Sequence, residues 1–395
     1  MDNSQQELSR RKFIVKVTAA GATLMLNPLF SLGKNDDDKR IAEIVARTTG
    51  VDTHNHIDVP LNPDELPGPK VDLAGNIRKS GLSAICMTFA VDYQKLSHEG
   101  EAYDRFINGL NAMDEVLKTN NMKRSLNLAD IKTAHKRHTP TVIQSVEGAH
   151  FLEGKLERVV VAYDRGLRQL GLLHDSDASI QLGDVYTNPP KWGGLTSFGA
   201  DVIKECERLG ILVDLTHASN ETINAALKIT TKPVIISHTG LDTQLGQNEF
   251  MAKMMRPRLI SKEQAKIVAS ADGVIGVWTH LSETPLEYAQ NVRAMVEVVG
   301  IDHVCIGTDT KMTPAYRSPA APGPKPVDPK SQPQDGKNSG RVGERTNEAW
   351  QSQKNGFYFA VVEALLKVGF VEDEIAKVGG GNFCRVFDAA ISGRQ

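Results

Sequence analysis

The sequence is poor in aromatic residues and has no excess of charge of either sign. Aromatic side chains make up 6% of its 395 residues, and 46 basic residues against 48 acidic ones give a formal net charge of -2. Proteins that bind single strands usually offer stacking aromatics, and binders of duplexes usually carry a basic excess or patch. A nucleic-acid partner is therefore not expected, although this composition does not exclude a local basic groove.

Cysteine is also scarce. The four cysteines are Cys86, Cys206, Cys305 and Cys384, and no two are close in sequence. This spacing argues against a CxxC redox or zinc motif and against a disulfide framework. With 40% hydrophobic residues, the chain is long enough to bury a large core, either as one barrel or as two smaller domains.

The N-terminus carries the features of an export signal. The twin arginine Arg10-Arg11 precedes an uncharged stretch over residues 17–33, which is followed by the charged run 34–40. The stretch is too short and too rich in Ala, Gly and Thr for a membrane span of ~20 strongly apolar residues. It resembles a bacterial twin-arginine (Tat) signal peptide. We therefore predict a signal peptide at 1–33, the Tat translocase as a partner during export, and a periplasmic or other extracytoplasmic location. A basic N-terminal helix is the alternative.

The remainder, residues 34–395, alternates short apolar runs with helical patterns. Each run is rich in β-branched residues and has about the length of a buried parallel strand. Eight strands separated by helices predict an α/β protein of the (β/α)8 TIM-barrel class. A doubly wound sheet is less well supported, because no Gly-rich phosphate turn follows an early strand. The predicted strands are Val51–Ile57, Ser83–Phe89, Thr141–Val146, Gly166–Leu172, Ile211–Leu215, Pro233–Ser237, Gly273–Trp278 and His303–Gly307.

Two regions interrupt this alternation. Residues 90–140 form a long helical excursion after the second predicted strand. The segment 313–343 contains seven prolines and cannot be regular structure. Because it follows the eighth strand, it would lie at the catalytic rim of a barrel, as a lid or as a disordered loop. Clear helices with capping residues are predicted from Thr196 or Ser197 to Leu209, from Ser261 to the residues before Gly273, and from Pro285 to Val299.

Six side chains able to bind metal lie at or just past the C-terminal ends of predicted strands. A barrel builds its active site from those ends. In the pair His54-Asn55-His56, the period of a strand directs both imidazoles to the same side. Imidazole together with carboxylate favours zinc, and so many ligands are compatible with two ions and one bridging carboxylate. The six residues are His54, His56, Glu147, His217, His238 and Asp309.

The sequence around these residues resembles the membrane dipeptidase (renal dipeptidase, peptidase M19) family. The similarity runs in order over roughly residues 45–390. It implies a (β/α)8 hydrolase of the metal-dependent amidohydrolase type, with two zinc ions, that cleaves dipeptides or similar small amides. The similar segments are VDTHNH (51–56), VEGAH (146–150), LVDLTHAS (212–219), PVIISH (233–238), GIDHVCIGTD (300–309) and GNFCRVF (381–387).

The resemblance also implies the metal ligands. Glu147 would bridge the two ions, with His54 and His56 on one ion and His217 and His238 on the other. A water molecule between two such ions becomes hydroxide near neutral pH and can attack an amide carbonyl.

Three further residues gain roles from the same resemblance. Asp309 would move the proton of the bridging water, and His174 would contact the carbonyl of the substrate. Arg258 would pair with the terminal carboxylate of the substrate, which would favour short substrates with a free C-terminus.

The sequence departs from the family at the first metal site and near the rim. His56 stands where the family usually has an aspartate, which removes one negative charge, and Asp58 is the nearest carboxylate that could compensate. Lys311 and the Pro-rich segment replace the usual sequence after the eighth strand. These departures leave open a substrate other than a dipeptide. Two other functions stay open: another metal-dependent hydrolase of the amidohydrolase type, such as a TatD-like nuclease, which uses the same ligand pattern, and a non-catalytic metal-binding exported protein. The oligomeric state is also open, and a homodimer is one candidate.

The export signal predicts the outcome of a conservative substitution. Changing both Arg10 and Arg11 to lysine should retain the protein in the cytoplasm, because the Tat route is characterised by its arginine pair. Cell fractionation measures the effect. An unchanged periplasmic yield would indicate the general secretory route or no export.

Overall fold

The computed structural model describes residues 29–66, 68–93, 95–175, 181–312, 350, 353 and 355–392. Most of the predicted signal peptide and the whole Pro-rich segment 313–343 lie outside these residues. The chain divides into two units after Arg47. The first contains helix α2 (Leu29–Arg47), which runs through the predicted end of the signal peptide at residue 33. No helix in the described part of the chain has the length and apolar character that a membrane crossing requires.

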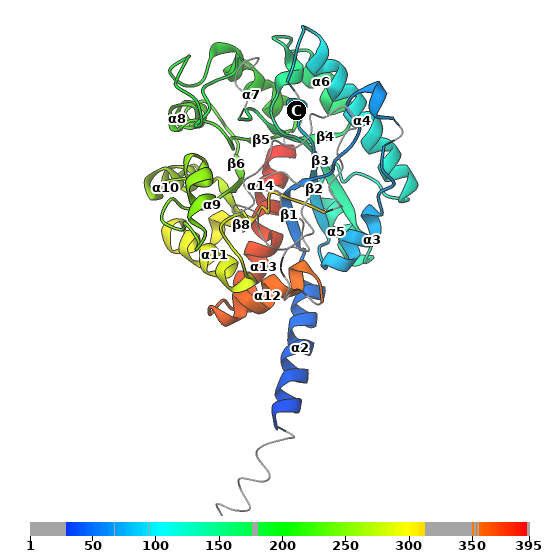
Figure 1. The fold of residues 1–395 in the computed structure, drawn as a ribbon, viewed down its shortest axis with the longest axis vertical. Helices are drawn as coiled ribbons and strands as arrows, with labels where there is room; N and C mark the ends of the chain where they lie inside the picture. The colour runs from blue at the N-terminus through cyan, green and yellow to red at the C-terminus, as the bar shows by residue number, and fades with distance from the viewer. Residues whose placement is uncertain are drawn as a thin grey trace, which may run out of the picture. The chain divides into compact units, whose positions relative to one another are not determined.

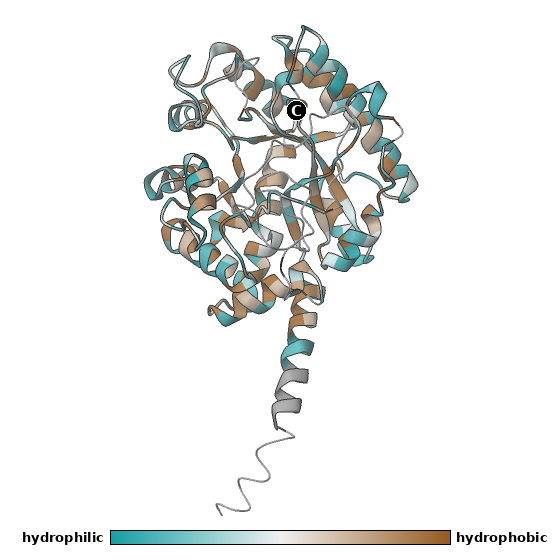
Figure 2. Ribbon diagram, in the orientation of Figure 1, coloured by the Kyte–Doolittle hydropathy of each residue, from teal (hydrophilic) through white to brown (hydrophobic). Residues whose placement is uncertain are grey.

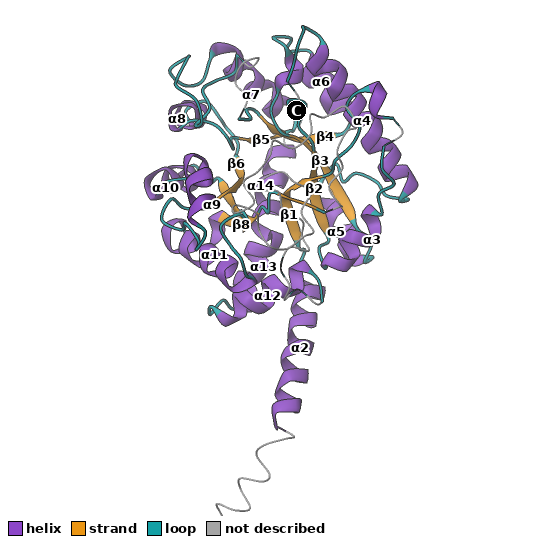
Figure 3. Ribbon diagram, in the orientation of Figure 1, coloured by secondary structure: helices purple, strands orange, loops and turns teal. Residues whose placement is uncertain are grey.

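The second unit is a (β/α)8 barrel built on a curled sheet of parallel strands (Figures 1 and 3). Neighbouring strands follow chain order from β1 to β8, and β9 pairs with the free edge of β1. Because only residues 307–309 separate β8 from β9, the chain itself joins the two ends of the sheet. All eight predicted strands are confirmed, and β9 is an addition. The strands are β1 (Val51–His56), β2 (Ala84–Thr88), β3 (Thr141–Val146), β4 (Leu167–Gly171), β5 (Leu212–Asp214), β6 (Ile235–Thr239), β7 (Val274–Val277), β8 (Val304–Ile306) and β9 (Thr310–Lys311).

Helices surround the strands, with apolar residues toward the sheet and polar residues outside (Figure 2). The predicted boundaries hold because the capping residues act as expected. The Thr196 side chain accepts a hydrogen bond from the Gly199 amide, and α7 ends at Gly210, whose φ is 85°. The helices of this unit are α3 (Leu73–Ser80), α4 (Glu101–Thr119), α5 (Leu128–Lys136), α6 (Arg158–Asp164), α7 (Ser197–Leu209), α8 (Asn220–Leu227), α9 (Glu249–Met255), α10 (Lys262–Ser270), α11 (Pro285–Val299), α12 (Phe357–Lys367), α13 (Glu372–Ala376) and α14 (Asn382–Ile391).

The last helix, α14, closes one end of the barrel. Figure 1 shows it in the middle of the ring of strands. Its residues Phe383, Val386, Phe387 and Ala390 belong to the same buried cluster as the first residues of five strands, namely Val51, Ala84, Leu212, Ile235 and Val274. The amino ends of the strands are therefore covered by apolar side chains, and the carboxyl ends remain available for a site.

Polar groups cross the interior of the barrel near its open end. The Thr53 hydroxyl lies 2.8 Å from the Ser237 carbonyl oxygen and 3.0 Å from that of Ile306, so β1 is tied to β6 and β8. Two glycines make this close approach possible. A Cβ atom would lie 1.9 Å from the Ser237 oxygen at Gly276 and 1.7 Å from it at Gly307.

This crowding predicts that Gly307→Ala lowers the free energy of unfolding by about 3 kcal/mol, since the methyl group would displace backbone rather than a flexible side chain. Gly369→Ala is the matched control. An added methyl there would meet only Arg293 Nη2 at 3.9 Å, so its cost is the ~1 kcal/mol of a left-handed backbone. Urea denaturation measures both variants, and equal losses would contradict the packing argument.

Candidate metal centre

The structure brings the six predicted metal-binding side chains together at the carboxyl ends of the strands. They come from the ends of β1 and β6 and from the loops that follow β3, β5 and β8. Five of them are buried, and the side chain of Asp309 is 21% exposed. Three groups of potential donor atoms lie within 4.8 Å of one another, and the groups share members. They are His54, Glu147 and His238; His54, His56 and Asp309; and Glu147, His174 and His217.

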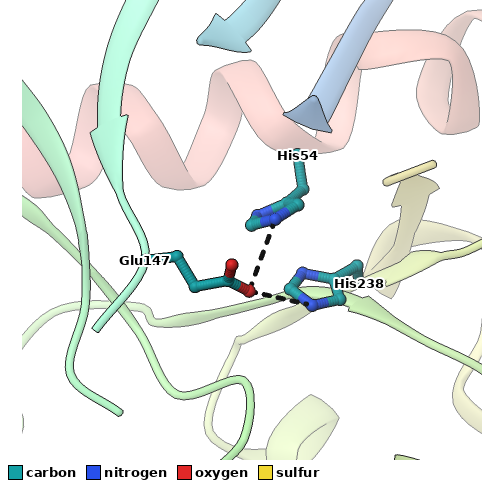
Figure 4. Close-up of side chains that lie close together, drawn as sticks. All are labelled: His54, Glu147 and His238. Carbon is teal, nitrogen blue, oxygen red and sulfur yellow. Dashed lines mark ion pairs between the residues drawn. The ribbon is translucent and has the colours of Figure 1, made fainter. Parts of the chain in front are cut away.

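Glu147 lies at the centre of this cluster. Its Oε1 is 2.8 Å from His217 Nε2. The same oxygen is 3.5 Å from Nε2 of both His54 and His238 (Figure 4). Its Oε2 instead faces His56 Nε2 at 3.6 Å and His174 Nε2 at 3.4 Å. The two oxygens thus face different imidazoles, which is the arrangement that a bridging carboxylate needs.

The imidazoles form two pairs. His54 Nε2 and His56 Nε2 are 3.1 Å apart, and His217 Nε2 and His238 Nε2 are 3.2 Å apart. Two nitrogens bound to one tetrahedral ion at 2.0–2.1 Å would lie about 3.3 Å apart. The spacing within each pair therefore fits a shared divalent ion, and the two pairs fit two ions with Glu147 between them.

Asp309 approaches the first pair. Its Oδ1 lies 3.2 Å from His56 Nε2 and 3.7 Å from His54 Nε2, while Oδ2 lies 2.8 Å from His280 Nε2. This position suits a metal ligand as well as a proton carrier. The φ angles of Asp309 and His217 are 54° and 67°, in the left-handed region that few side chains adopt. The fold therefore holds two of the six side chains in an unfavourable backbone conformation that points them into the site.

The charges of these groups suit a cation. Burial favours the neutral form of Glu147, but the imidazoles of His174 and His54 and a hydrogen bond from His217 outweigh it, so its pKa is held well below the usual range. Burial also lowers the pKa of His54 and that of His238, which keeps both imidazoles neutral near pH 7. Neutral imidazoles around an ionised carboxylate are the protonation states that metal binding requires.

His217 differs from His54 and His238. Burial alone would lower its pKa, but hydrogen bonds to Asp175 and Glu147 raise that pKa to about 10. In the metal-free protein His217 is therefore protonated at neutral pH, and a metal ion that binds this imidazole would have to displace the proton. Metal binding here should release a proton and weaken as the pH falls below 10.

Each imidazole is oriented through its Nδ1 atom. Asp175 Oδ1 and the Tyr186 hydroxyl each lie 2.9 Å from His217 Nδ1. Such contacts fix the ring and its tautomer, so that Nε2 faces the site. The same arrangement recurs with Asp92 at 2.8 Å from His174 Nδ1, Tyr93 at 2.6 Å from His56 Nδ1 and Ser237 Oγ at 3.0 Å from His238 Nδ1.

These supporting residues are additions to the site predicted from the sequence. Asp92 and Tyr93 follow β2 and Asp175 follows β4 within a few residues, so position just past a strand end was a signal available for these three, whereas Tyr186 lies further along the loop after β4. His280, whose Nε2 contacts Asp309, had the same signal at the end of β7.

The two predicted cationic residues of the rim each meet a carboxylate. Arg258, in the turn Arg256–Arg258, donates from Nη2 to Asp175 Oδ2 and from Nη1 to the Met254 carbonyl at 3.1 Å. Lys311 Nζ lies 2.6 Å from Asp58 Oδ2, and both side chains are largely buried. Asp58 thus neutralises Lys311 and does not belong to the donor groups of the metal cluster.

Comparison with known proteins identifies the same architecture. The model of the membrane dipeptidase (peptidase family M19) family matches residues 38–317. An amidohydrolase from Pseudomonas aeruginosa has 22% identity and a TM-score of 0.68, covering 89% of this chain and 99% of that one. A probable dipeptidase from the same organism has 15% identity and a TM-score of 0.68, covering 90% and 98%. A metallopeptidase from Rhodobacter sphaeroides, liganded with a phosphinate mimic of the dipeptide L-Ala-D-Ala, has 15% identity and a TM-score of 0.63, covering 87% and 99%. At these identities the likeness concerns the fold.

The position of His56 yields a prediction for the first ion. His56→Ala should lower the bound metal by one equivalent and leave the ion at His217 and His238, because it removes one nitrogen of the first pair only. Elemental analysis of purified protein measures this. His98→Ala is the control, since that histidine side chain is 68% exposed on the surface. Unchanged metal content in His56→Ala would show that His56 is not a ligand.

Proposed function

Because this chain belongs to the membrane dipeptidase family (peptidase family M19), we propose that it is a zinc-dependent hydrolase that cleaves the amide bond of dipeptides or similar small amides. Family membership supports a metallo-dipeptidase, and the observation that carries the finer proposal is Glu147, whose carboxylate lies within 3.6 Å of nitrogens from both imidazole pairs. The dipeptide mimic bound by the Rhodobacter sphaeroides metallopeptidase supports a small peptide-like substrate.

The donor set supports zinc at both positions. His54 and His56 would hold one ion, His217 and His238 the other, and Glu147 both, with imidazole and carboxylate as the donor types that zinc prefers. Two bound zinc ions would supply Lewis acidity and a water molecule with a lowered pKa.

Three side chains then handle the substrate. Burial disfavours a charged His174, but the carboxylates of Glu147 and Asp92 raise its pKa, so its Nε2 can donate to the carbonyl oxygen as negative charge develops there. Asp309 is held ionised by His238, His280 and His56 against the effect of burial, which suits a group that takes a proton and returns it to the leaving amine. Arg258 would pair with the terminal carboxylate of the substrate, on the side of the leaving amine.

Two alternatives remain distinguishable. A nuclease of the TatD type would need cationic contacts to phosphate, and the two rim cations Arg258 and Lys311 are each paired with an acid. A non-catalytic binding protein would be free to lose ligands, whereas all six predicted donors are present and converge. We also propose, from the N-terminal sequence alone, that the enzyme acts outside the cytoplasm after export.

The proposal predicts close to two zinc equivalents per chain and hydrolysis of dipeptides but not of nucleic acid. Glu147→Gln should abolish turnover with the fold intact, because a neutral amide cannot compensate two cations. Metal analysis, circular dichroism and a dipeptide panel give the readouts. Glu115→Gln is the control, as this side chain is 61% exposed on α4. Failure to take up any transition metal, or a wild-type rate in Glu147→Gln, would refute the two-metal site.

A further inference from the structure

A cavity of about 310 Å³ adjoins the second imidazole pair. Its lining includes His217, His238, Tyr186 and Arg258, together with apolar side chains such as Ile223 and Ile236. The cavity therefore touches two proposed metal ligands and the arginine expected to bind the terminal carboxylate of a substrate. Its position suits the part of a small amide substrate that departs with the leaving amine.

Arg258 is already engaged at this cavity. Its Nη2 donates to Asp175 Oδ2, and the other oxygen of Asp175 lies 2.9 Å from His217 Nδ1. The side chains of Asp175 and Arg258 are 29% and 27% exposed, so a bound molecule can reach both. One internal carboxylate thus occupies the arginine that a substrate carboxylate would use.

The contact between Asp175 and Arg258 weakens the attraction of Arg258 for a substrate carboxylate. A guanidinium favours a carboxylate through paired N–H donors and opposite charge. Asp175 accepts from one of those donors and offsets the positive charge of Arg258. A substrate carboxylate bound to Arg258 would also be repelled by the like charge of Asp175. Arg258 is the one arginine or lysine among the described lining residues, and Glu221, which also lines the cavity, is acidic. A substrate whose terminal carboxyl is blocked escapes this repulsion.

We propose that Asp175 is a specificity-determining residue that acts through Arg258 and relaxes the demand for a free terminal carboxylate. The site then takes carboxyl-blocked small amides, such as dipeptide amides, about as well as free dipeptides. This inference rests on the proposed hydrolase function and names its substrate class.

Matched substrates test the inference. The ratio of kcat/KM for Ala-Phe to that for Ala-Phe amide, measured as release of alanine by the zinc-loaded enzyme, should stay within about tenfold of unity in the wild type. In Asp175→Asn the ratio should rise about tenfold in favour of the free acid, mainly through a lower KM, since a charged hydrogen bond becomes available to the substrate. In the double variant Asp175→Asn/Arg258→Met the ratio should return to the wild-type value, because the effect requires the arginine.

The ratio separates specificity from structure. Asp175→Asn also alters a contact of His217, and any loss of metal or fold would lower both rates together and leave the ratio unchanged. Asp175→Ser provides a second neutral side chain. A wild-type preference for the free acid above a hundredfold, or an unchanged ratio in both variants with zinc retained, would overturn the inference. Calorimetric binding of phenylalanine and phenylalaninamide gives the same comparison without turnover. If the protein hydrolyses neither substrate, the proposed function is wrong. The binding comparison still decides the role of Asp175 in that case.

Discussion

The site depends on one buried charge, the carboxylate of Glu147. An ionised carboxylate away from water is costly unless cations or hydrogen-bond donors surround it. Here the surroundings are imidazoles from several strands, and the closest is His217 at 2.8 Å. Because these imidazoles can also bind metal, the groups that accommodate the charge are the groups that would hold the ions. Removing the carboxylate would leave the imidazoles, and any ions they hold, without a shared counter-charge.

The barrel supplies the geometry that this arrangement requires. Apolar packing of α14 closes the amino ends of the strands, so polar side chains collect at the other end. Thr53 ties β1 to β6 and β8, and these are strands whose ends carry His54, His238 and, just beyond β8, Asp309. The close contact at Gly276 and Gly307 allows that spacing. Backbone packing near the open end of the barrel is thus coupled to the donor distances of the site beside it.

Where the sequence departs from the family pattern, a nearby carboxylate offsets the change in charge. His56, where the family resemblance leads us to expect an aspartate, is oriented by Tyr93, and its Nε2 lies 3.2 Å from Asp309, so a carboxylate lies next to the first imidazole pair. Lys311 would add positive charge beside that pair, but Asp58 neutralises it. Asp175 has the corresponding effect on Arg258. The rim therefore presents less free positive charge than its composition suggests.

The sequence by itself determined the strands and the histidines and carboxylates that converge at their carboxyl ends. Runs of β-branched residues mark buried strands, and parallel strands of a barrel place their carboxyl ends together, so residues such as His54 and His217 could be predicted to meet. The terminal helix α14 could not be assigned its place, because the glycines before it, Gly379 to Gly381, resemble a loop. Only the tertiary structure decided which charges pair. Asp175 contacts Arg258, and Asp58 contacts Lys311, across long separations in the chain, and no local pattern encodes such contacts. They arise because loops from different strands end at one rim, where unpaired buried charges would be costly.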